Sequence, residues 1–301
     1  MTPMKTIDEA VVVGRIDENQ PSRNFRWWAV VLLALVIGFV YYKTLGKLVM
    51  DWWTDPNFSH GFLVPLFSAW VVWKDRKHLS ALSLRPSWLG MVVILFSLAT
   101  LVVGAFGAEL FLARISFVFL LAGVVIYFLG WHFFRALLFP WAFLFLMIPI
   151  PALIFNQITL PLQLLASRLA SSILPLLGVP VLREGNVIVL PAMPLEVAEA
   201  CSGIRSLMSL GALAVIYGYL LEPRILMRVL LLIAAVPIAV AANALRVVGT
   251  GLCVQYWDPA KALGFFHEFS GWVIFIVAFG LLVLVHRGLQ LPNYLRSRRS
   301  S

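Results

Sequence analysis

The chain has 301 residues, of which 61% are hydrophobic and 12% charged, and its formal net charge is +9. A soluble domain carries about 45–50% apolar and about 25% charged residues, so this composition excludes a water-soluble globule and a disordered chain. The 23 Lys and Arg residues, against 14 Asp and Glu, are spread between long apolar runs. This distribution is typical of a polytopic membrane protein and excludes a nucleic-acid-binding role.

Eight apolar stretches are long enough, or nearly so, to cross a bilayer core of about 30 Å. In chain order they are Trp27–Tyr42, Phe58–Trp73, Trp88–Gly107, Ile115–Phe133, Ala136–Phe155, Ser206–Leu221, Ile225–Val247 and Phe269–Val285. We therefore predict an all-α polytopic membrane protein with about eight transmembrane helices. Residues 1–26 form a polar N-terminal tail, residues 27–286 the membrane domain and residues 287–301 a basic C-terminal tail.

A long segment, Asn156–Arg205, separates the fifth stretch from the sixth. Its first part, Gln157–Leu177, has apolar residues at helical spacing and is expected to lie in the membrane or at its surface, because two prolines disfavour a regular span. Further on, a Glu-Gly-Asn turn at 184–186 lies between runs of β-branched residues, which is typical of a hairpin. We predict a small β element that leads into the sixth span.

The basic residues indicate an orientation. Cytoplasmic loops of membrane proteins carry an excess of Lys and Arg. The tight clusters Lys74–Lys77 and Arg296–Arg299 fall on the same side of the predicted spans, together with most of the other basic residues. We therefore expect a bacterial cytoplasmic (inner) membrane protein with both termini in the cytoplasm and the segment Asn156–Arg205 outside.

Three polar side chains stand at the outer ends of the last three spans: Cys201, Arg246 and His267. At 1.5 Å per residue, each lies about 30 Å along its helix from the opposite membrane face, so the three are expected to meet near one plane. Cysteine, arginine and histidine together suit nucleophilic catalysis. The thiolate attacks a carbonyl, the histidine transfers protons, and the arginine holds anionic charge or an oxyanion.

Each of these residues also has a plainer interpretation. Near a helix N-terminus, and with Arg205 four residues later, Cys201 favours the thiolate form, but a small buried cysteine fits this position equally well. Arg246 could extend to the lipid headgroups, and His267 could be an interfacial histidine. Ser202 is a weaker nucleophile candidate, because the Gly-x-Ser-x-Gly elbow is absent.

The remaining candidates are less specific. Two cysteines lack any zinc spacing, and we expect no metal and no cofactor. Cys253, expected in a short outer connection, is either inert or a disulfide partner of Cys201. Ser59 and His60 are either interfacial anchors or part of a substrate cleft, and Glu109 is expected to pair with Arg114 at the membrane edge.

Three motifs in order make a more specific pattern: Glu199-Ala200-Cys201-Ser202-Gly203-Ile204-Arg205, Asn243-x-x-Arg246, and His267 ahead of the last span. In this combination the chain resembles the exosortase/archaeosortase family of membrane cysteine transpeptidases. The stretches Ser59-His60-Gly61-x-Leu63-Val64-Pro65 and Ile148-Pro149-Ile150-Pro151 are also similar to that family. The resemblance covers about residues 25–290, and it is to exosortases made of a single membrane module, the B type among them.

The resemblance implies a cysteine peptidase or transpeptidase that sorts exported proteins. Its substrates would carry a C-terminal tripartite signal: a Pro-Glu-Pro (PEP-CTERM) motif, a transmembrane helix and a basic cluster. Cleavage near the motif would be followed by transfer to an acceptor, lipid- or polysaccharide-linked. Carried over to this chain, Cys201 is the nucleophile that forms a thioester, Arg246 the oxyanion or carboxylate partner and His267 the proton-transfer residue. The substrate-contact residues would be Ser59, His60, Glu199, Arg205 and Asn243.

Two other function classes stay open on the sequence. A permease or polysaccharide export component could bind an anionic substrate through Arg246 and His267. Such a transporter should have helices broken near the midplane; Pro237 offers one break, but the polar residues cluster at one end instead. A ligase for lipid-linked glycans would also use arginine and histidine, and it would need no cysteine.

Overall fold

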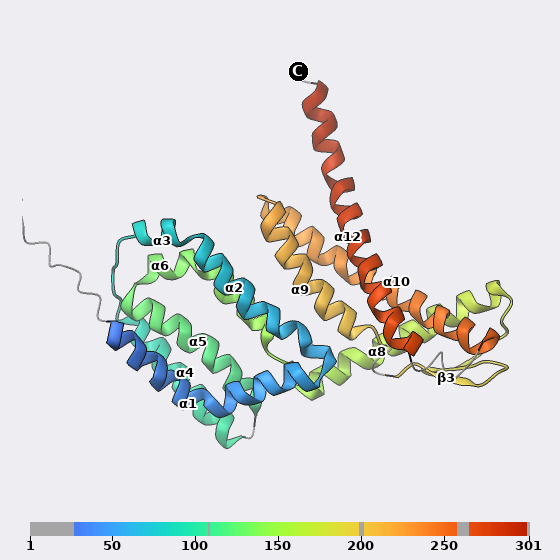
Figure 1. Ribbon diagram of the computed structural model, residues 1–301, viewed down its shortest axis with the longest axis horizontal. Coiled ribbons are helices and arrows are strands. Elements are labelled where there is room, and N and C mark those ends of the chain that lie inside the picture. Colours follow the sequence, from blue (N-terminus) through green and yellow to red (C-terminus); the bar gives the residue numbers. More distant parts are fainter. Residues whose placement is uncertain (1–26, 108, 199–201, 258–264, 300–301) are drawn as a thin grey trace, which may run out of the picture. The chain divides into compact units, whose positions relative to one another are not determined.

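The computed structural model describes residues 27–107, 109–198, 202–257 and 265–299, with the backbone alone for residue 27, residues 265–268 and residues 291–299. Most of these residues are helical (Figure 1). Among them, seven helices are long and apolar enough to cross a membrane. They are α1 (Trp27–Thr54), α4 (Leu89–Phe106), α5 (Leu110–Phe128), α8 (Ala152–Ile173), α9 (Ile204–Leu221), α10 (Ile225–Tyr256) and α12 (Phe265–Arg299). The chain is therefore an all-α multi-pass membrane protein with one small sheet, as predicted.

The chain divides into two compact units, residues 1–42 and 43–301. The described part of the first unit is the beginning of α1, an unbroken apolar helix on which the rings of Phe39 and Tyr42 stack. The second unit holds the remaining elements. Its shorter helices are η1 (Pro56–Phe62), α2 (Leu63–Lys74), α3 (Arg76–Ala81), α6 (Trp131–Ala136), α7 (Leu138–Phe143), η2 (Leu144–Met147) and η3 (Leu174–Leu177).

The predicted second span is confirmed as helix, but it is built from two parts, η1 and α2. The predicted fifth span, Ala136–Phe155, is wrong: α7 and η2 end at Met147, and the next helix, α8, begins only at Ala152. Pro149 and Pro151 cause the break, because proline has no N–H and disfavours the helical conformation in the residue before it. The segment Gln157–Leu177, expected in the membrane or at its surface, is helical and belongs to α8 and η3, which together are long and apolar enough to span a membrane.

A small antiparallel sheet follows α8 and η3, in the predicted place. It consists of β1 (Leu182–Glu184), β2 (Val187–Val189) and β3 (Pro194–Glu196) in the order β1-β2-β3, with a turn at Gly185. Ile188 in the central strand is fully buried against Ala170 of α8 and Val254 of α10. This core fixes the sheet to the end of α10.

α10 extends beyond its predicted end at Val247 to Tyr256. Cys253 therefore lies inside a helix and not in a connection, and its thiol is free. The side chain of Leu174 packs onto Gly251, since a Cβ built there would lie 3.2 Å from it. This packing stabilises the last turns of α10, which composition alone did not predict to be helical.

Arg114 of α5 is buried and pairs with Asp51 near the end of α1, and not with Glu109 as predicted. Glu109 is the residue that precedes α5. A separation of five residues turns a helix through about 500°, so Glu109 and Arg114 face different sides. The ion pair joins α1 and α5 within the second unit.

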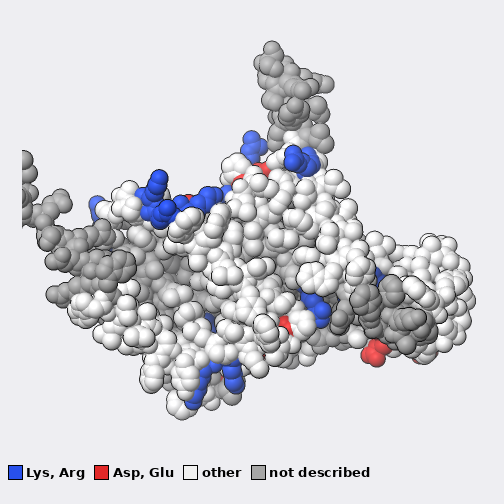
Figure 2. Space-filling model, viewed as in Figure 1, with Lys and Arg blue, Asp and Glu red and all other residues white. Residues whose placement is uncertain are grey.

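Basic and aromatic side chains mark one edge of the second unit. In Figure 2, Lys and Arg gather along the edge that carries α3, α6 and the turn between α9 and α10. The ammonium group of Lys74 lies 5.2 Å from the ring centre of Trp70, and the guanidinium of Arg76 lies 4.3 Å from that of Trp73. Tryptophan beside basic residues is typical of a membrane–water interface, so this edge marks one membrane boundary.

A buried polar network joins α9 to α12 at the same edge. The ring of His286 lies 2.6 Å from an oxygen of Glu222 through Nε2 and 2.8 Å from the hydroxyl of Tyr217 through Nδ1. Gln290 also donates to Glu222, at 2.6 Å. The hydrogen bond from His286 holds the pKa of the Glu222 carboxyl below its ordinary value, against the effect of burial. The network therefore fixes the part of α12 around His286 to the end of α9.

We expect Glu222→Gln to lower the Tm of the purified protein by a few degrees at pH 7, because a charge-assisted hydrogen bond between buried groups is worth about 1.5–3 kcal/mol. Since the folded pKa is lowered, this stabilisation is complete above the ordinary pKa of glutamate and is lost as the pH falls through the folded value. The difference in Tm should shrink in acid. Glu184→Gln, at an exposed carboxylate, is the control. Equal Tm values for the two variants at pH 7 would contradict the role of the network.

Candidate functional site

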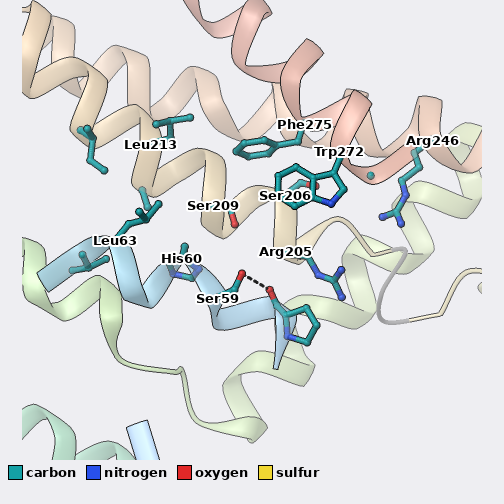
Figure 3. A pocket seen from close by; sticks show the side chains of 15 residues that line it. Ser59, His60, Leu63, Arg205, Ser206, Ser209, Leu213, Arg246, Trp272 and Phe275 are labelled. Carbon is teal, nitrogen blue, oxygen red and sulfur yellow. Dashed lines mark hydrogen bonds between the residues drawn. The ribbon is translucent and has the colours of Figure 1, made fainter. Parts of the chain in front are cut away.

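One pocket of about 580 Å³ lies between η1 and α2 on one side and α9, α10 and α12 on the other (Figure 3). One end of it is polar and is lined by Ser59, His60, Arg205 and Arg246. Toward the other end the lining is mainly aliphatic and aromatic, with Leu63, Leu213, Ile216 and Phe275. The pocket thus joins residues that the sequence singled out in both halves of the chain.

The Ser-His-Gly motif holds η1 at the mouth of the pocket. His60 is only 6% exposed, and its Nε2 lies 3.2 Å from the carbonyl oxygen of Leu146. A carbonyl accepts only, so Nε2 carries the hydrogen. Gly61 lies against the indole of Trp52, because a Cβ built there would be 2.3 Å from Nε1, and this Nε1 donates to the carbonyl of Met147 at 2.8 Å.

These contacts join the two motifs of the N-terminal half. Leu146 and Met147 immediately precede the Ile-Pro-Ile-Pro stretch at 148–151, so the proline break ends the helix beside η1. The carboxylate of Asp55 accepts from the backbone N–H of Asn57 at 2.8 Å and caps η1. These contacts fix η1 in a position where Ser59 and His60 line the pocket.

The Cys-Ser-Gly motif is anchored by a close contact between Gly203 and Asn243. Gly203 has φ +84°, in the left-handed region, and stands immediately before α9. A Cβ built on it would lie 2.9 Å from Cβ and Cγ of Asn243. Only glycine satisfies both conditions. Ser202 is buried, and its Oγ accepts from the N–H of Ile204 at 3.2 Å.

Arg246 follows Asn243 by three residues on α10, so both lie on the same helix face. It is 8% exposed and lines the polar end of the pocket. Its guanidinium lies against Gly271 of α12, where a Cβ would be 3.5 Å from Nη2. Arg246 does not end the span as predicted, because α10 continues for more than two turns beyond it.

Arg205 stands in the first turn of α9, at the same end of the pocket as Arg246 (Figure 3). Its Nε is buried, and it has no hydrogen-bond partner among the residues that the structure describes. None of the described lining residues is acidic. Arg205 is partly buried, which favours an anionic partner for its charge, and a guanidinium suits a carboxylate or phosphate. The polar end of the pocket is therefore suited to an anionic ligand.

The structure describes only some of the predicted site residues. Cys201 and Glu199 lie outside the described residues, and for His267 only the backbone is given, in the first turn of α12. Ser59, His60, Arg205 and Arg246 come together in the pocket. Asn243 is buried beside Gly203, and it is not among the described residues that line the pocket.

Sequence reasoning missed several residues of the pocket. Ser206 and Ser209 of α9 and Gly271, Trp272 and Phe275 of α12 all line it. The helical spacing of 205, 209, 213 and 216 was visible in the sequence, but it resembles any buried helix face. In the described part of the chain, no three His, Cys, Asp or Glu side chains form a group that could hold a metal ion.

The family model described as transmembrane exosortase (Exosortase_EpsH) matches residues 52–284. The match includes all the residues that line the pocket and also the Cys201 motif and His267. No curated protein and no solved structure matches the chain. The matched residues make up most of the chain, which therefore belongs to the transmembrane exosortases, a family of membrane protein-sorting cysteine transpeptidases.

Proposed function

We propose that this exosortase cleaves Pro-Glu-Pro sorting signals from exported proteins and transfers the new C-terminus to an acceptor through a thioester on Cys201. The observation that carries the proposal is the contact between Gly203 and Asn243. It fixes the chain two residues after Cys201 to the helix face that carries Arg246. We therefore propose that the thiol of Cys201 acts at the polar end of the pocket.

The reaction follows from the residue chemistry. The thiolate of Cys201 attacks the scissile carbonyl carbon, and Arg246 stabilises the negative charge on the carbonyl oxygen. When the C–N bond breaks, His267 gives a proton to the leaving amine, and the acyl group stays on sulfur as a thioester. The acceptor nucleophile then attacks the thioester, loses its proton to His267 and releases the thiolate.

Substrate recognition is assigned to the other polar residues of the pocket. The partly buried guanidinium of Arg205 suits the glutamate of the motif, and Ser59 and His60 face the same space. Asn243 acts by positioning Gly203, a role that its packing supports. Glu199 is proposed as a further substrate contact because it begins the Cys201 motif.

The proposed orientation in the membrane follows from the positive-inside rule. The edge that carries α3 and the α9–α10 turn is rich in Lys and Arg (Figure 2), so we assign it to the cytoplasm of a bacterium. The polar end of the pocket is near the opposite ends of α9 and α12, which gives an active site facing outward from the inner membrane. Residues 27–286 form the catalytic domain, both termini are cytoplasmic, and the acceptor is lipid- or polysaccharide-linked.

Cys201→Ala should abolish processing of a tagged protein that carries the tripartite signal, because loss of a catalytic nucleophile lowers kcat by a factor of about 10⁴ or more. Processing is measured by immunoblot in cells that lack the native enzyme, with both enzymes present at equal membrane levels. Cys253→Ala, at the free thiol of α10, is the matched control and should process normally. Normal processing by Cys201→Ala would end the proposal of a cysteine nucleophile.

Arg205→Ala should remove the preference for an acidic motif. Loss of a charge-assisted hydrogen bond costs about 1.5–3 kcal/mol, so processing of a Pro-Glu-Pro signal should fall about 10- to 100-fold. A Pro-Gln-Pro signal should be processed equally by the variant and the wild type. Arg246→Ala should impair both signals alike. If Arg205→Ala reduced both signals by the same factor, Arg205 would not recognise the glutamate.

Gly203→Ala should remove most processing at an unchanged membrane level. A left-handed conformation costs an L-residue about 1–2 kcal/mol, and the new Cβ would also push Asn243 away. Gly185→Ala is the control, since Gly185 has φ +63° but open space around its Cβ position. Equal activity of the two variants would show that the contact with Asn243 does not matter.

A further inference from the structure

We infer that the apolar part of the pocket is a lateral slot for the transmembrane helix of the sorting signal, an inference that rests on the proposed function. The slot is lined by Leu63, Ser209, Ala212, Leu213, Ile216 and Phe275. It receives the first three turns of that helix after the cleavage motif, and it fixes the depth at which the motif meets Arg205 and Arg246.

One face of α9 forms the back of the slot. The pocket residues of α9 stand at positions 205, 206, 209, 212, 213 and 216, which follow one another on a single helix face. This face is about 16 Å long at 1.5 Å per residue, or three turns. The other side of α9 buries Leu210 and Ala214 against α10 and α12. On the opposite face, the pocket separates α9 from η1 and α2, and Ile216 at the end of this face packs against the cluster that contains Val64 and Phe143.

Small residues make this face suited to a second helix. Ser206, Ser209 and Ala212 follow one another at intervals of three, and Gly271 lines the pocket from α12. Between transmembrane helices, small residues allow the backbones to approach closely. An occupant at membrane depth must also satisfy its own backbone hydrogen bonds, as only a helix or a closed barrel does. A lipid chain has no backbone, so it would need neither the close approach that small residues allow nor internal backbone hydrogen bonds.

The volume of the pocket indicates how much of the substrate helix can enter the slot. Three turns of a helix about 10–12 Å wide fill roughly 1,500 Å³, against about 580 Å³ for the pocket. One face of the helix therefore lies in the slot, and the other faces the lipid. The exposure of Leu63, at 58%, is consistent with a slot open to the side.

An aromatic cluster limits the slot toward the cytoplasmic end of α9. The ring of Tyr219 stacks on Phe139 with centres 4.0 Å apart and meets Phe67 of α2 edge-on at 6.1 Å. These rings join α9 to α2 and α7 one turn beyond Ile216. A helix that enters from the polar end cannot pass between α2 and α9 at this level, so only its outer half is bound.

Photo-crosslinking in intact membranes tests the slot. A photoreactive amino acid replaces Leu63 or Phe275, which line it, or Leu66 or Ile276, which are 68% and 66% exposed and lie outside it. The enzyme also carries Cys201→Ala, so that binding is measured without turnover. We expect at least fivefold more adduct with the helix of a tagged substrate from positions 63 and 275 than from 66 and 276. Mass spectrometry should locate the adducts in the outer three turns.

Equal adducts at all four positions, or lipid adducts alone at positions 63 and 275, would overturn the slot. This outcome is distinct from failure of the proposed function, which would appear as processing by Cys201→Ala. A second variant, Ser209→Leu, fills the small-residue face and should lower both the adduct at position 275 and the processing about tenfold. Ser172→Leu, at an exposed serine of α8, is the matched control. Unchanged processing and adduct in Ser209→Leu would likewise contradict the inference.

Discussion

The packing of Gly203 onto Asn243 is the contact on which the geometry of the site depends. It brings the backbone at the start of α9 directly against the side chain of Asn243 in the middle of α10. Because Asn243 and Arg246 share one face of α10, the same contact sets the position of the guanidinium relative to the turn that follows Cys201. A single backbone-to-side-chain approach thus links two motifs that are far apart in the sequence, and it explains why each contains a residue with no evident chemical role.

The cost of charge inside a membrane explains how the remaining polar groups are arranged. Arg205 and Arg246 are gathered at one end of α9, and Glu222 with His286 at the other. Between them, the walls of the pocket are apolar or carry only serine hydroxyls. The Glu222 network fixes α12 to α9 around His286, so that Gly271 and Phe275, nearer the beginning of α12, form a stable wall. Two polar clusters at the membrane boundaries therefore hold an apolar slot between them.

Sequence reasoning identified the long helices because their apolar runs exceed a bilayer thickness, and it found the hairpin at Gly185 from its turn residues. Sequence reasoning failed where contacts between residues far apart in the sequence determine where a helix ends or which residues pair. The length of the apolar run predicted a fifth span across Pro149 and Pro151. The sequence also predicted that the seventh span, α10, ends at Val247, because the packing of Leu174 on Gly251 cannot be seen in the sequence. Arg114 was assigned to the nearest acid along the chain, whereas its partner, Asp51, is brought close only by the fold.

The pocket itself was the hardest feature to predict, because its walls come from elements with ordinary sequences. Trp272 and Phe275 resemble lipid-facing residues, and Ser206 and Ser209 resemble polar substitutions that any transmembrane helix tolerates. These residues line a pocket because η1 is held in place on its other side. The hydrogen bond between His60 and the carbonyl of Leu146 fixes η1, and the pocket lies between η1 and α12. The motif around His60 therefore shapes the pocket, whereas the motifs around Cys201 and Arg246 are those to which we assign its chemistry. On this assignment, residues of the N-terminal half form one wall of a site whose proposed reactive groups all belong to the C-terminal half.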